Sequence, residues 1–304
     1  MRSIDLRIGT RGSALAQAQA VLVIRALALV GVRATTVIVE TAGDVRAADT
    51  AWGEGAFVMA IEEALLAGSV DIAVHSAKDV PTDVDPRLLI AAFLTRADAR
   101  DALVVRAGLG PLLDDLPSGA RIGTDSPRRT GFLLAHRPDL DVRPLHGNVD
   151  TRLRRLDDGA ADGLILACAG LDRLGLADRI GERLDPRTVP PAAGQGAVAV
   201  QVRSDDDETI ALVRTIDDAD TRLVVETERA FLAASGGGCR APIGAHAEVI
   251  GTNLGLFGGY VAPDGSDVQF GQVHGRVRDA TALASELASS LRSITTGRRA
   301  AVPW

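Results

Sequence analysis

The feature that most limits the fold of this chain is an internal echo. The tetrapeptide RIGT occurs at 7–10 and again at 121–124, each time between a strand-like and a helix-like stretch. A second echo follows, because 62–76 and 154–168 both read as a helix, a glycine, an aspartate and a buried strand. Strands that alternate with amphipathic helices are typical of parallel α/β sheets. A repeat of four residues could arise by chance, but the second echo favours two similar α/β domains around a cleft.

Helix signals support this interpretation. Ser13 is a plausible N-cap for the helix after the first RIGT, and Gly31 is a plausible stop. After the second RIGT, Ser126 is the expected cap and Pro127 suits the first helical position. The stretch 57–67 shows apolar residues at helical spacing. Asp150 is expected to cap a further short helix.

The pattern changes near residue 217. A helix comes first, strand-like segments follow near 242–249, 254–262 and 267–276, and a last helix spans about 279–294. The stretch 184–208 resembles a crossover back to the first domain. We therefore expect two doubly wound domains of the periplasmic-binding-protein type and a small α+β domain. The expected boundaries are 1–97 with 194–216, then 98–193, then 217–304.

Charge and hydropathy restrict the partners. The formal net charge is −7, which disfavours a general nucleic-acid or anionic-membrane binder. No apolar run approaches the ~20 residues that span a bilayer, and charged residues stand where a secretory signal would be apolar. A cytoplasmic protein with neither kind of partner is expected. The stretch 121–155 differs, with eight arginines and four aspartates.

The arginines gather where an anion could bind. Backbone N–H groups at a helix start form an anion site, and arginine adds bidentate recognition of carboxylates. Any single arginine is more simply explained as a solvated surface charge. Several at helix starts and after strands indicate an anionic ligand with several carboxylates. The residues concerned are Thr10, Arg11 and Ser13 at one helix start, Thr124, Ser126, Arg128 and Arg129 at the other, and Arg152, Arg154, Arg155 and Arg173 beyond.

Two further residues could do chemistry. Asp79 follows a buried strand and could serve as a general acid or base, or it could be a turn residue paired with Lys78, the only lysine. Cys239 stands among glycines beside Arg240, which favours a thiolate, although an unreactive loop thiol is the alternative. No histidine has a readable spacing to Cys239. Phosphate-loop, zinc-helix and dinucleotide motifs are absent, so we expect no ATP, NAD or metal.

Together these stretches resemble the porphobilinogen deaminase (hydroxymethylbilane synthase) family. The matching segments run in family order from about 6 to 248, and the most specific are HSAKDVPT, SPRRTGFLLAHRP and GGGCRAPIGAHA. The resemblance implies a monomeric transferase of heme biosynthesis. It would join four porphobilinogen molecules into hydroxymethylbilane and release ammonia. It also implies a dipyrromethane cofactor that is held by a thioether to Cys239.

The resemblance also implies roles for individual residues. Asp79 would be catalytic, assisting loss of the amino group, stabilising an azafulvenium-type cation and deprotonating the growing pyrrole. The implied cofactor-binding residues are Cys239, Lys78, Thr124, Ser126, Arg128 and Arg129. The implied substrate-binding residues are Arg11, Ser13, Gln19, Phe57, His146, Asn148, Arg152 and Arg173.

Two positions depart from the family pattern. His146 stands where arginine is usual, and Glu54 stands where many members have a basic residue. If His146 holds a substrate carboxylate, binding should weaken as the imidazole loses its proton at high pH. The departures leave open a cofactor-carrying homologue with impaired turnover. A cytosolic two-domain protein that binds a small anion is another alternative, because echoed α/β halves fit that architecture too.

Overall fold

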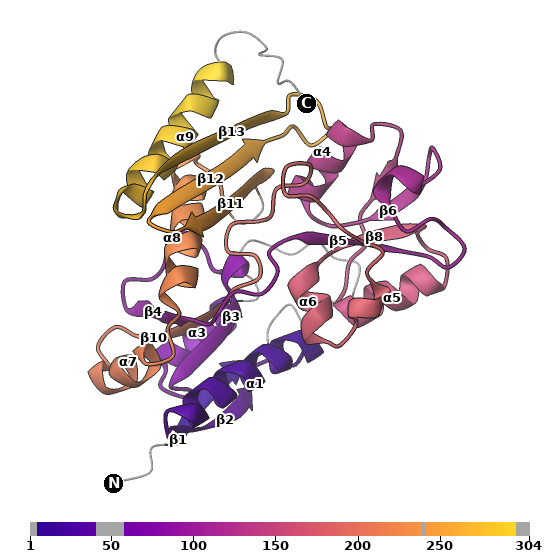
Figure 1. Ribbon diagram of the computed structural model, residues 1–304. Coiled ribbons are helices and arrows are strands. Elements are labelled where there is room, and N and C mark those ends of the chain that lie inside the picture. Colours follow the sequence, from indigo (N-terminus) through magenta and orange to yellow (C-terminus); the bar gives the residue numbers. More distant parts are fainter. Residues whose placement is uncertain (1–4, 41–57, 239–240, 296–304) are drawn as a thin grey trace. The chain divides into compact units, whose positions relative to one another are not determined.

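The computed structural model of the chain describes residues 5–40, 58–238 and 241–295, without the side chains of 292–295. The chain divides into two compact units. The first unit comprises 1–97 with 196–222, and the second comprises 98–195 with 223–304. The division into three domains expected from the sequence stays a prediction. Figure 1 labels the elements.

The first unit is built on a five-stranded sheet. Its strands, in spatial order, are β2 (Arg33–Ile38), β1 (Asp5–Thr10), β3 (Ile72–Ser76), β10 (Val198–Arg203) and β4 (Leu88–Phe93). β1 runs parallel to β2 and β3, whereas β10 runs antiparallel to β3 and β4. The helices of this unit are α1 (Ala14–Leu29), α3 (Met59–Leu66) and α7 (Asp207–Arg214), with the first turn of α8 (Ala219–Ala234) and the 3-10 turn η1 (Ala77–Asp79).

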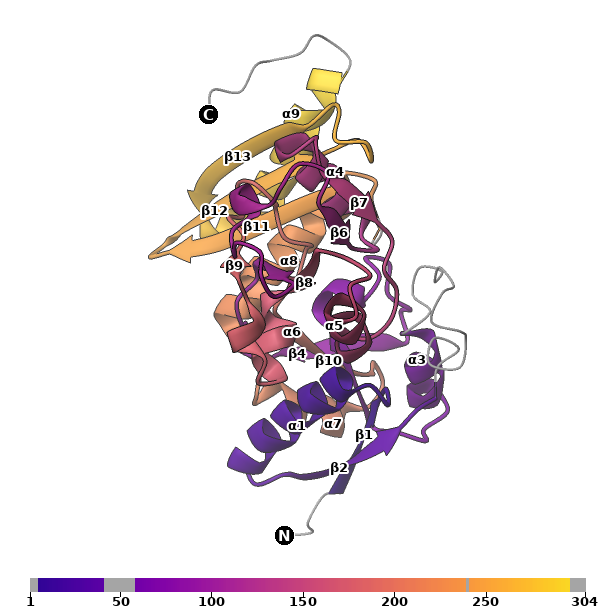
Figure 2. The ribbon, with the colours of Figure 1, turned by 90° about the vertical axis from the view of Figure 1, so that its right-hand side faces the viewer.

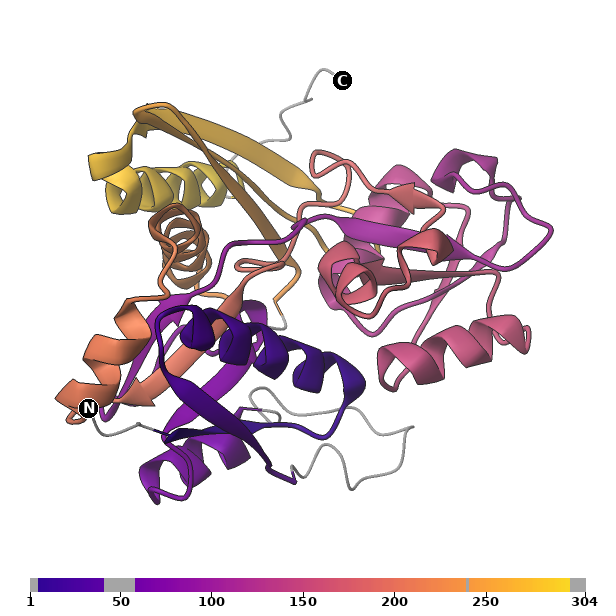
Figure 3. The same ribbon diagram turned by 60° about the horizontal axis from the view of Figure 1, so that its bottom comes forward.

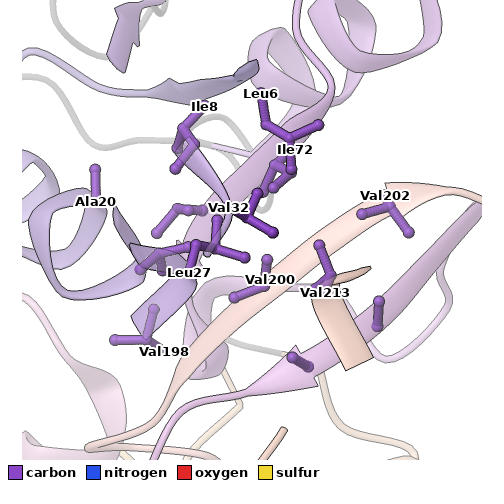
Figure 4. Close-up of a cluster of buried hydrophobic side chains, with 14 of the residues drawn as sticks. Leu6, Ile8, Ala20, Leu27, Val32, Ile72, Val198, Val200, Val202 and Val213 are labelled. Carbon is purple, nitrogen blue, oxygen red and sulfur yellow. The ribbon is translucent and has the colours of Figure 1, made fainter. Parts of the chain in front are cut away.

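Apolar side chains on both faces of this sheet explain why helices cover it. On one face, Ile8, Ile72 and Val200 pack in a cluster with Leu27 of α1 and Val213 of α7 (Figure 4). Helix α1 crosses this unit's strands in Figure 3. On the other face, Ile61 and Leu65 of α3 are buried in a second cluster. Burial on both faces is the pattern expected for a mostly parallel sheet.

The second unit contains a sheet of the same design. Its strands, in spatial order, are β7 (Asp141–Arg143), β6 (Arg121–Gly123), β8 (Gly163–Ala167), β5 (Asp101–Val105) and β9 (Glu182–Arg183). β6 is parallel to β7 and β8, and β5 is antiparallel to β8 and β9. The flanking helices are α4 (Pro127–His136), α5 (Val149–Asp157) and α6 (Cys168–Arg173), with 3-10 turns η2 (Leu113–Asp115) and η3 (Ala177–Arg179).

The same unit also holds a three-stranded antiparallel sheet. Its elements are β11 (Ile243–Ile250), β12 (Asn253–Tyr260), β13 (Gln269–Arg276), the turn η4 (Val277–Asp279) and helix α9 (Ala280–Thr295). Helix α9 covers one face of this sheet (Figure 1). Figure 2 shows α4 beside it, where Phe132 of α4 stacks on Phe270 of β13 at 5.5 Å between ring centroids.

The predicted fold class is confirmed: two similar α/β sheets and a small α+β part. The caps at Ser13 and Ser126 are also confirmed, since each side chain accepts a backbone N–H of its helix. The expected cap at Asp150 is wrong. Asn148 occupies the N-cap of α5, and Asp150 lies in the first turn, where a negative charge favours the helix dipole. None of the described helices is long and apolar enough to cross a membrane.

Candidate active site

The predicted site residues lie at corresponding edges of the two sheets. In the first unit, Arg11 follows β1, and Lys78 and Asp79 follow β3 in η1. In the second unit, Ser126 follows β6 and Arg173 lies at the end of α6 after β8. All four strands are parallel members of their sheets, so these residues gather at the carboxyl edges. Ligands of open α/β sheets bind at such edges.

Asp79 is half-buried in η1, beyond the end of β3. Its carboxylate accepts no hydrogen bond and forms no ion pair within the part of the chain that the structure describes. The predicted alternative of a pair with Lys78 is therefore not seen there. Gln19 of α1 donates to the hydroxyl of Ser76 at 2.8 Å, which ties α1 to the end of β3.

A buried chain of polar groups supports β3 just before this turn. Gln201 donates its amide to Glu62 of α3 at 2.8 Å, so its oxygen faces His75 Nε2 at 3.1 Å. The carboxylate of Glu62 can only accept, so it fixes the Gln201 amide with the nitrogen toward Glu62 and the oxygen toward His75. The Gln201 oxygen also can only accept, and therefore the Nε2 of His75 carries the proton. Burial lowers the pKa of His75 to about 4. His75 is thus neutral near pH 7 and is a structural residue of β3.

In the second unit, the start of α4 brings two arginines to one buried carboxylate. Arg128 Nη1 lies 2.8 Å from Asp101 Oδ2, and Arg129 donates through Nε and Nη2 to Asp101 Oδ1 at 3.0 and 2.7 Å. Arg128 also donates to the Pro190 carbonyl, and Arg129 donates to the Ile165 carbonyl. The Asp101 side chain is 0% exposed.

Electrostatics at this cluster leave a positive excess. Burial alone would raise the pKa of Asp101, but the charges and hydrogen bonds of the two arginines outweigh burial and hold this pKa well below its usual range. Burial lowers the pKa of Arg128. Two guanidiniums facing one carboxylate carry a net charge of one, which favours a bound anion.

Asp125 is a second carboxylate at this edge, and it contacts two more of the predicted site residues. His146 Nδ1 lies 2.8 Å from Asp125 Oδ1, and Arg152 Nη2 lies 3.8 Å from Asp125 Oδ2. Asp125 precedes the cap Ser126, so α4 and α5 begin near the same carboxylate. Burial lowers the pKa of Arg152 and also that of Arg173. Two half-buried arginines thus add to the cationic character of this edge.

The structure does not describe every predicted residue. Phe57, Cys239 and the divergent Glu54 lie outside the described residues. On either side of Cys239 and Arg240, the Ala241 N–H donates to the Gly238 carbonyl at 3.0 Å. Cys168 is buried in the core, and burial raises the pKa of its thiol to about 12.

Sequence reasoning missed three buried polar residues: Asp101, Gln195 and Glu228. Gln195 donates to Asp101 Oδ1 at 2.9 Å. Glu228 had a readable signal, because it follows Val224 by four residues and precedes Phe231 by three. That spacing puts a carboxylate on the apolar face of α8. Asp101 had none, since its partners are distant in sequence.

The donor set fits a ligand that carries carboxylates. Arginines, the hydroxyls of Thr124 and Ser126, and the N-terminus of α4 are all donors, and Ser126 caps that helix. In the described part of the chain Arg128 donates only through Nη1, which leaves Nε and Nη2 for a ligand. Arg129 instead has all three of its nitrogens bonded within the fold. A dipyrromethane, whose rings bear acidic side chains, is compatible with this donor set.

Each unit has an α/β sheet whose parallel strands end among basic side chains. This arrangement is typical of the class of α/β proteins that bind an anionic ligand. Comparisons with known proteins specify the family. The family description "Porphobilinogen deaminase, dipyromethane cofactor binding domain" matches residues 6–211, and "Porphobilinogen deaminase, C-terminal domain" matches residues 222–293. Among solved structures, the methionine binding protein MetQ is similar at a TM-score of 0.45, with 15% identity, 77% of this chain and 96% of that chain covered.

Curated relatives agree with the family match. The porphobilinogen deaminase of Roseiflexus castenholzii is 46% identical over 292 residues, covering 94% of this chain and 95% of its own. That of Mycobacteroides abscessus is 49% identical over 273 residues, covering 86% and 89%. That of Nitrobacter hamburgensis is 45% identical over 292 residues, covering 94% and 92%. The chain belongs to the porphobilinogen deaminase family, and the predicted resemblance is confirmed.

Proposed function

We propose that this chain joins four porphobilinogen molecules into hydroxymethylbilane, with release of ammonia, on a dipyrromethane bound through a thioether to Cys239. In each step a carbon–carbon bond forms between the substrate's aminomethyl carbon and a pyrrole carbon of the growing chain. The carbon–nitrogen bond breaks, ammonia leaves, and the pyrrole carbon loses a proton. After four such steps, one water cleaves the carbon–carbon bond between the tetrapyrrole and its primer: the product takes the hydroxyl group and the primer carbon takes the proton. The enzyme is therefore a transferase.

The observation that carries this proposal is the excess of cations at the edge of the second unit's α/β sheet. Among the described residues, the buried Arg128 and Arg129 and the half-buried Arg152 pair with only two carboxylates, Asp101 and Asp125. Uncompensated buried charge is costly unless a ligand supplies the counter-charge. Porphobilinogen and its oligomers bear an acetate and a propionate on every ring, so each added unit brings two carboxylates. An edge of this kind supports a polyanionic growing chain.

Asp79 is proposed as the catalytic group. A half-buried carboxylate with no described partner is free to take a proton from the growing chain and to return it to the departing amine. Its negative charge also stabilises the positive charge that develops on the substrate carbon. The ordered β3 and the link between Gln19 and Ser76 hold the preceding residues in place.

The remaining predicted roles are part of the same proposal. When bound, the dipyrromethane would supply the terminal pyrrole to which the first substrate unit is joined. Lys78 and the start of α4 would hold its carboxylates, with Arg129 acting chiefly by fixing Asp101. The residues proposed to bind substrate are Arg11, Ser13, Gln19, Phe57, His146, Asn148, Arg152 and Arg173.

Turnover tests the proposal. The purified protein is incubated with porphobilinogen, and ammonia and linear tetrapyrrole are measured for wild type and Asp79→Asn. Asparagine keeps the shape of the side chain and removes its proton chemistry, so we expect a loss of roughly 10²- to 10⁴-fold in kcat. Wild-type protein that binds porphobilinogen and releases no ammonia would reject the proposed reaction.

A second candidate is a family member that loads its cofactor but turns over poorly. The contact at 2.8 Å between His146 and Asp125 favours it, because a histidine engaged by a carboxylate offers less charge to a substrate than a free arginine. The same turnover assay on cofactor-loaded protein separates the two candidates. Restored activity in His146→Arg would favour the impaired variant.

A further inference from the structure

Residues 190–195 link two parts of the second unit that the proposed function requires to act together; we refer to them as the connector. Two adjacent carbonyls of the connector bind different elements. The Pro190 carbonyl accepts from Arg128 at the start of α4, and the Pro191 carbonyl accepts from the Ala245 N–H of β11 at 2.8 Å. Arg128 and β11 are therefore attached to neighbouring residues of one segment.

The end of the connector repeats this arrangement with buried side chains. Gln195 donates to Asp101 at 2.9 Å and to the Ala99 carbonyl at 2.7 Å. Gly194 N–H donates to Glu228 at 2.7 Å. The other oxygen of Glu228 accepts from Ala247 N–H of β11 at 2.8 Å. A continuous path thus runs from Asp101 through Gln195, Gly194 and Glu228 to β11.

The two ends of this path have functional meaning. Asp101 holds Arg128 and Arg129. Glu228 belongs to α8, which ends at Ala234, and binds β11, which begins at Ile243. The loop between these two elements contains position 239. Glu228 therefore fixes both elements that flank the cysteine loop.

We propose that Gln195 and Glu228 are positioning residues of the cofactor site. They hold the two elements that flank the cysteine loop, α8 and β11, at a fixed distance from Arg128 and Arg129. This inference rests on the proposed function. A group anchored at position 239 can reach Arg128 with its carboxylates only if the anchor and the arginine keep a fixed separation. Directional hydrogen bonds between buried groups set such a separation more strictly than apolar packing does.

The burial of the path supports a positioning role. Asp101, Gln195 and Glu228 are each 0% exposed. A buried carboxylate costs desolvation energy, and a well-packed apolar residue would often be as stable in its place. The buried carboxylates of Asp101 and Glu228 are therefore better explained by the fixed separation that they impose on the elements they join than by stability alone.

The test compares two path variants with a matched control in the same unit. Glu228→Gln leaves one backbone N–H facing an amide donor, and Gln195→Leu removes the bond to Asp101. The control is Asp162→Asn, because Asp162 also accepts from an arginine and a backbone N–H but lies outside the path. Folding is checked by circular dichroism and thermal unfolding. Cofactor loading is read as the fraction of protein with the added mass of two pyrrole units.

We expect the loaded fraction of both path variants to fall roughly tenfold relative to Asp162→Asn, even where the thermal midpoints of variant and control are equal. One lost hydrogen bond to a buried charged group is worth about that factor. Normal loading in both path variants would overturn the proposal. Equal loss in Asp162→Asn would also overturn it, because a general loss of stability would then be the cause. If Glu228→Gln does not fold, Gln195→Leu decides. Wild-type protein that never gains mass would reject the proposed function itself, and this inference with it.

Discussion

Arg7 and Asp71 are joined by four hydrogen bonds in the first unit. The Arg7 side chain donates from Nε at 3.0 Å and from Nη2 at 2.7 Å, its backbone N–H donates at 2.8 Å, and the Asp71 N–H returns a bond to the Arg7 carbonyl at 2.9 Å. Arg121 and Asp162 repeat these bonds in the second unit at 2.8–3.1 Å. In each unit the first sequence echo supplies the arginine and the second supplies the aspartate. The resulting pair joins β1 to β3 in the first unit and β6 to β8 in the second.

Removal of either aspartate should destabilise its own unit. Asp71→Asn and Asp162→Asn should each lower the free energy of unfolding by about 1 kcal/mol, a modest value because the arginines are partly exposed. Urea denaturation measures this loss. Asp5→Asn, which breaks a fully surface pair with Arg33, is the control and should change nothing measurable. Equal effects of all three variants would contradict the account.

Stability should also fall on mild acidification because of His75. The folded-state pKa of His75 is lowered to about 4 by burial, whereas the unfolded value is 6.5. The unfolded chain therefore binds a proton first as the pH falls below 6.5, and the folded state loses about 3 kcal/mol by pH 4. Above pH 6.5 both states are neutral at His75, and this effect vanishes.

The variant His75→Gln isolates this contribution, because glutamine cannot take up the proton. The difference in unfolding free energy between wild type and variant should shift by about 3 kcal/mol between pH 6.5 and pH 4, in favour of the variant at low pH. Urea denaturation at several pH values gives the difference. A difference that stays constant with pH would show that His75 does not titrate as its burial requires.

Whether a feature of the fold or site could be predicted from the sequence depends on how far apart along the chain the contacting residues lie. The caps at Ser13 and Ser126 depend on residues three positions away, and both were predictable. The echoes indicated two like sheets because they repeat local patterns. Asp101 was not predictable as a site residue, since it meets Arg128 only after 27 residues and Gln195 only after 94. Contacts of that range are set by topology, which local patterns do not encode.

Close approach at Gly244 gives a steric prediction. A Cβ added there would lie 2.4 Å from Pro190 Cβ and 2.5 Å from the Pro190 carbonyl oxygen, so β11 or the connector must shift in Gly244→Ala. We expect a loss of about 1–3 kcal/mol in unfolding free energy, as for other overpacked sites. Gly255→Ala on the neighbouring strand is the control, because its new methyl would meet only the side chain of the exposed His274. If both variants unfold alike, the contact with Pro190 is not tight.

His146 predicts a difference in substrate affinity from its arginine variant. The groups around it are Asp125 at 2.8 Å, Arg152 on the far oxygen of Asp125, and Arg155, which donates to the His146 carbonyl. A guanidinium is permanently charged and can bind a carboxylate through two N–H groups at once, which an imidazole cannot do. The KM for porphobilinogen should therefore be lower in His146→Arg than in wild type. Equal KM values for the two proteins would remove His146 from the substrate site.

The most direct test of the central claim is the intact mass of the purified protein beside that of Cys239→Ser. Wild type should exceed its sequence mass by two linked pyrrole units, and the variant should not, since serine offers no thiolate for the thioether. Wild type that lacks this mass should acquire it on incubation with porphobilinogen. A wild-type mass that stays at the sequence value after incubation, or an equal gain in Cys239→Ser, would contradict a cofactor anchored at Cys239.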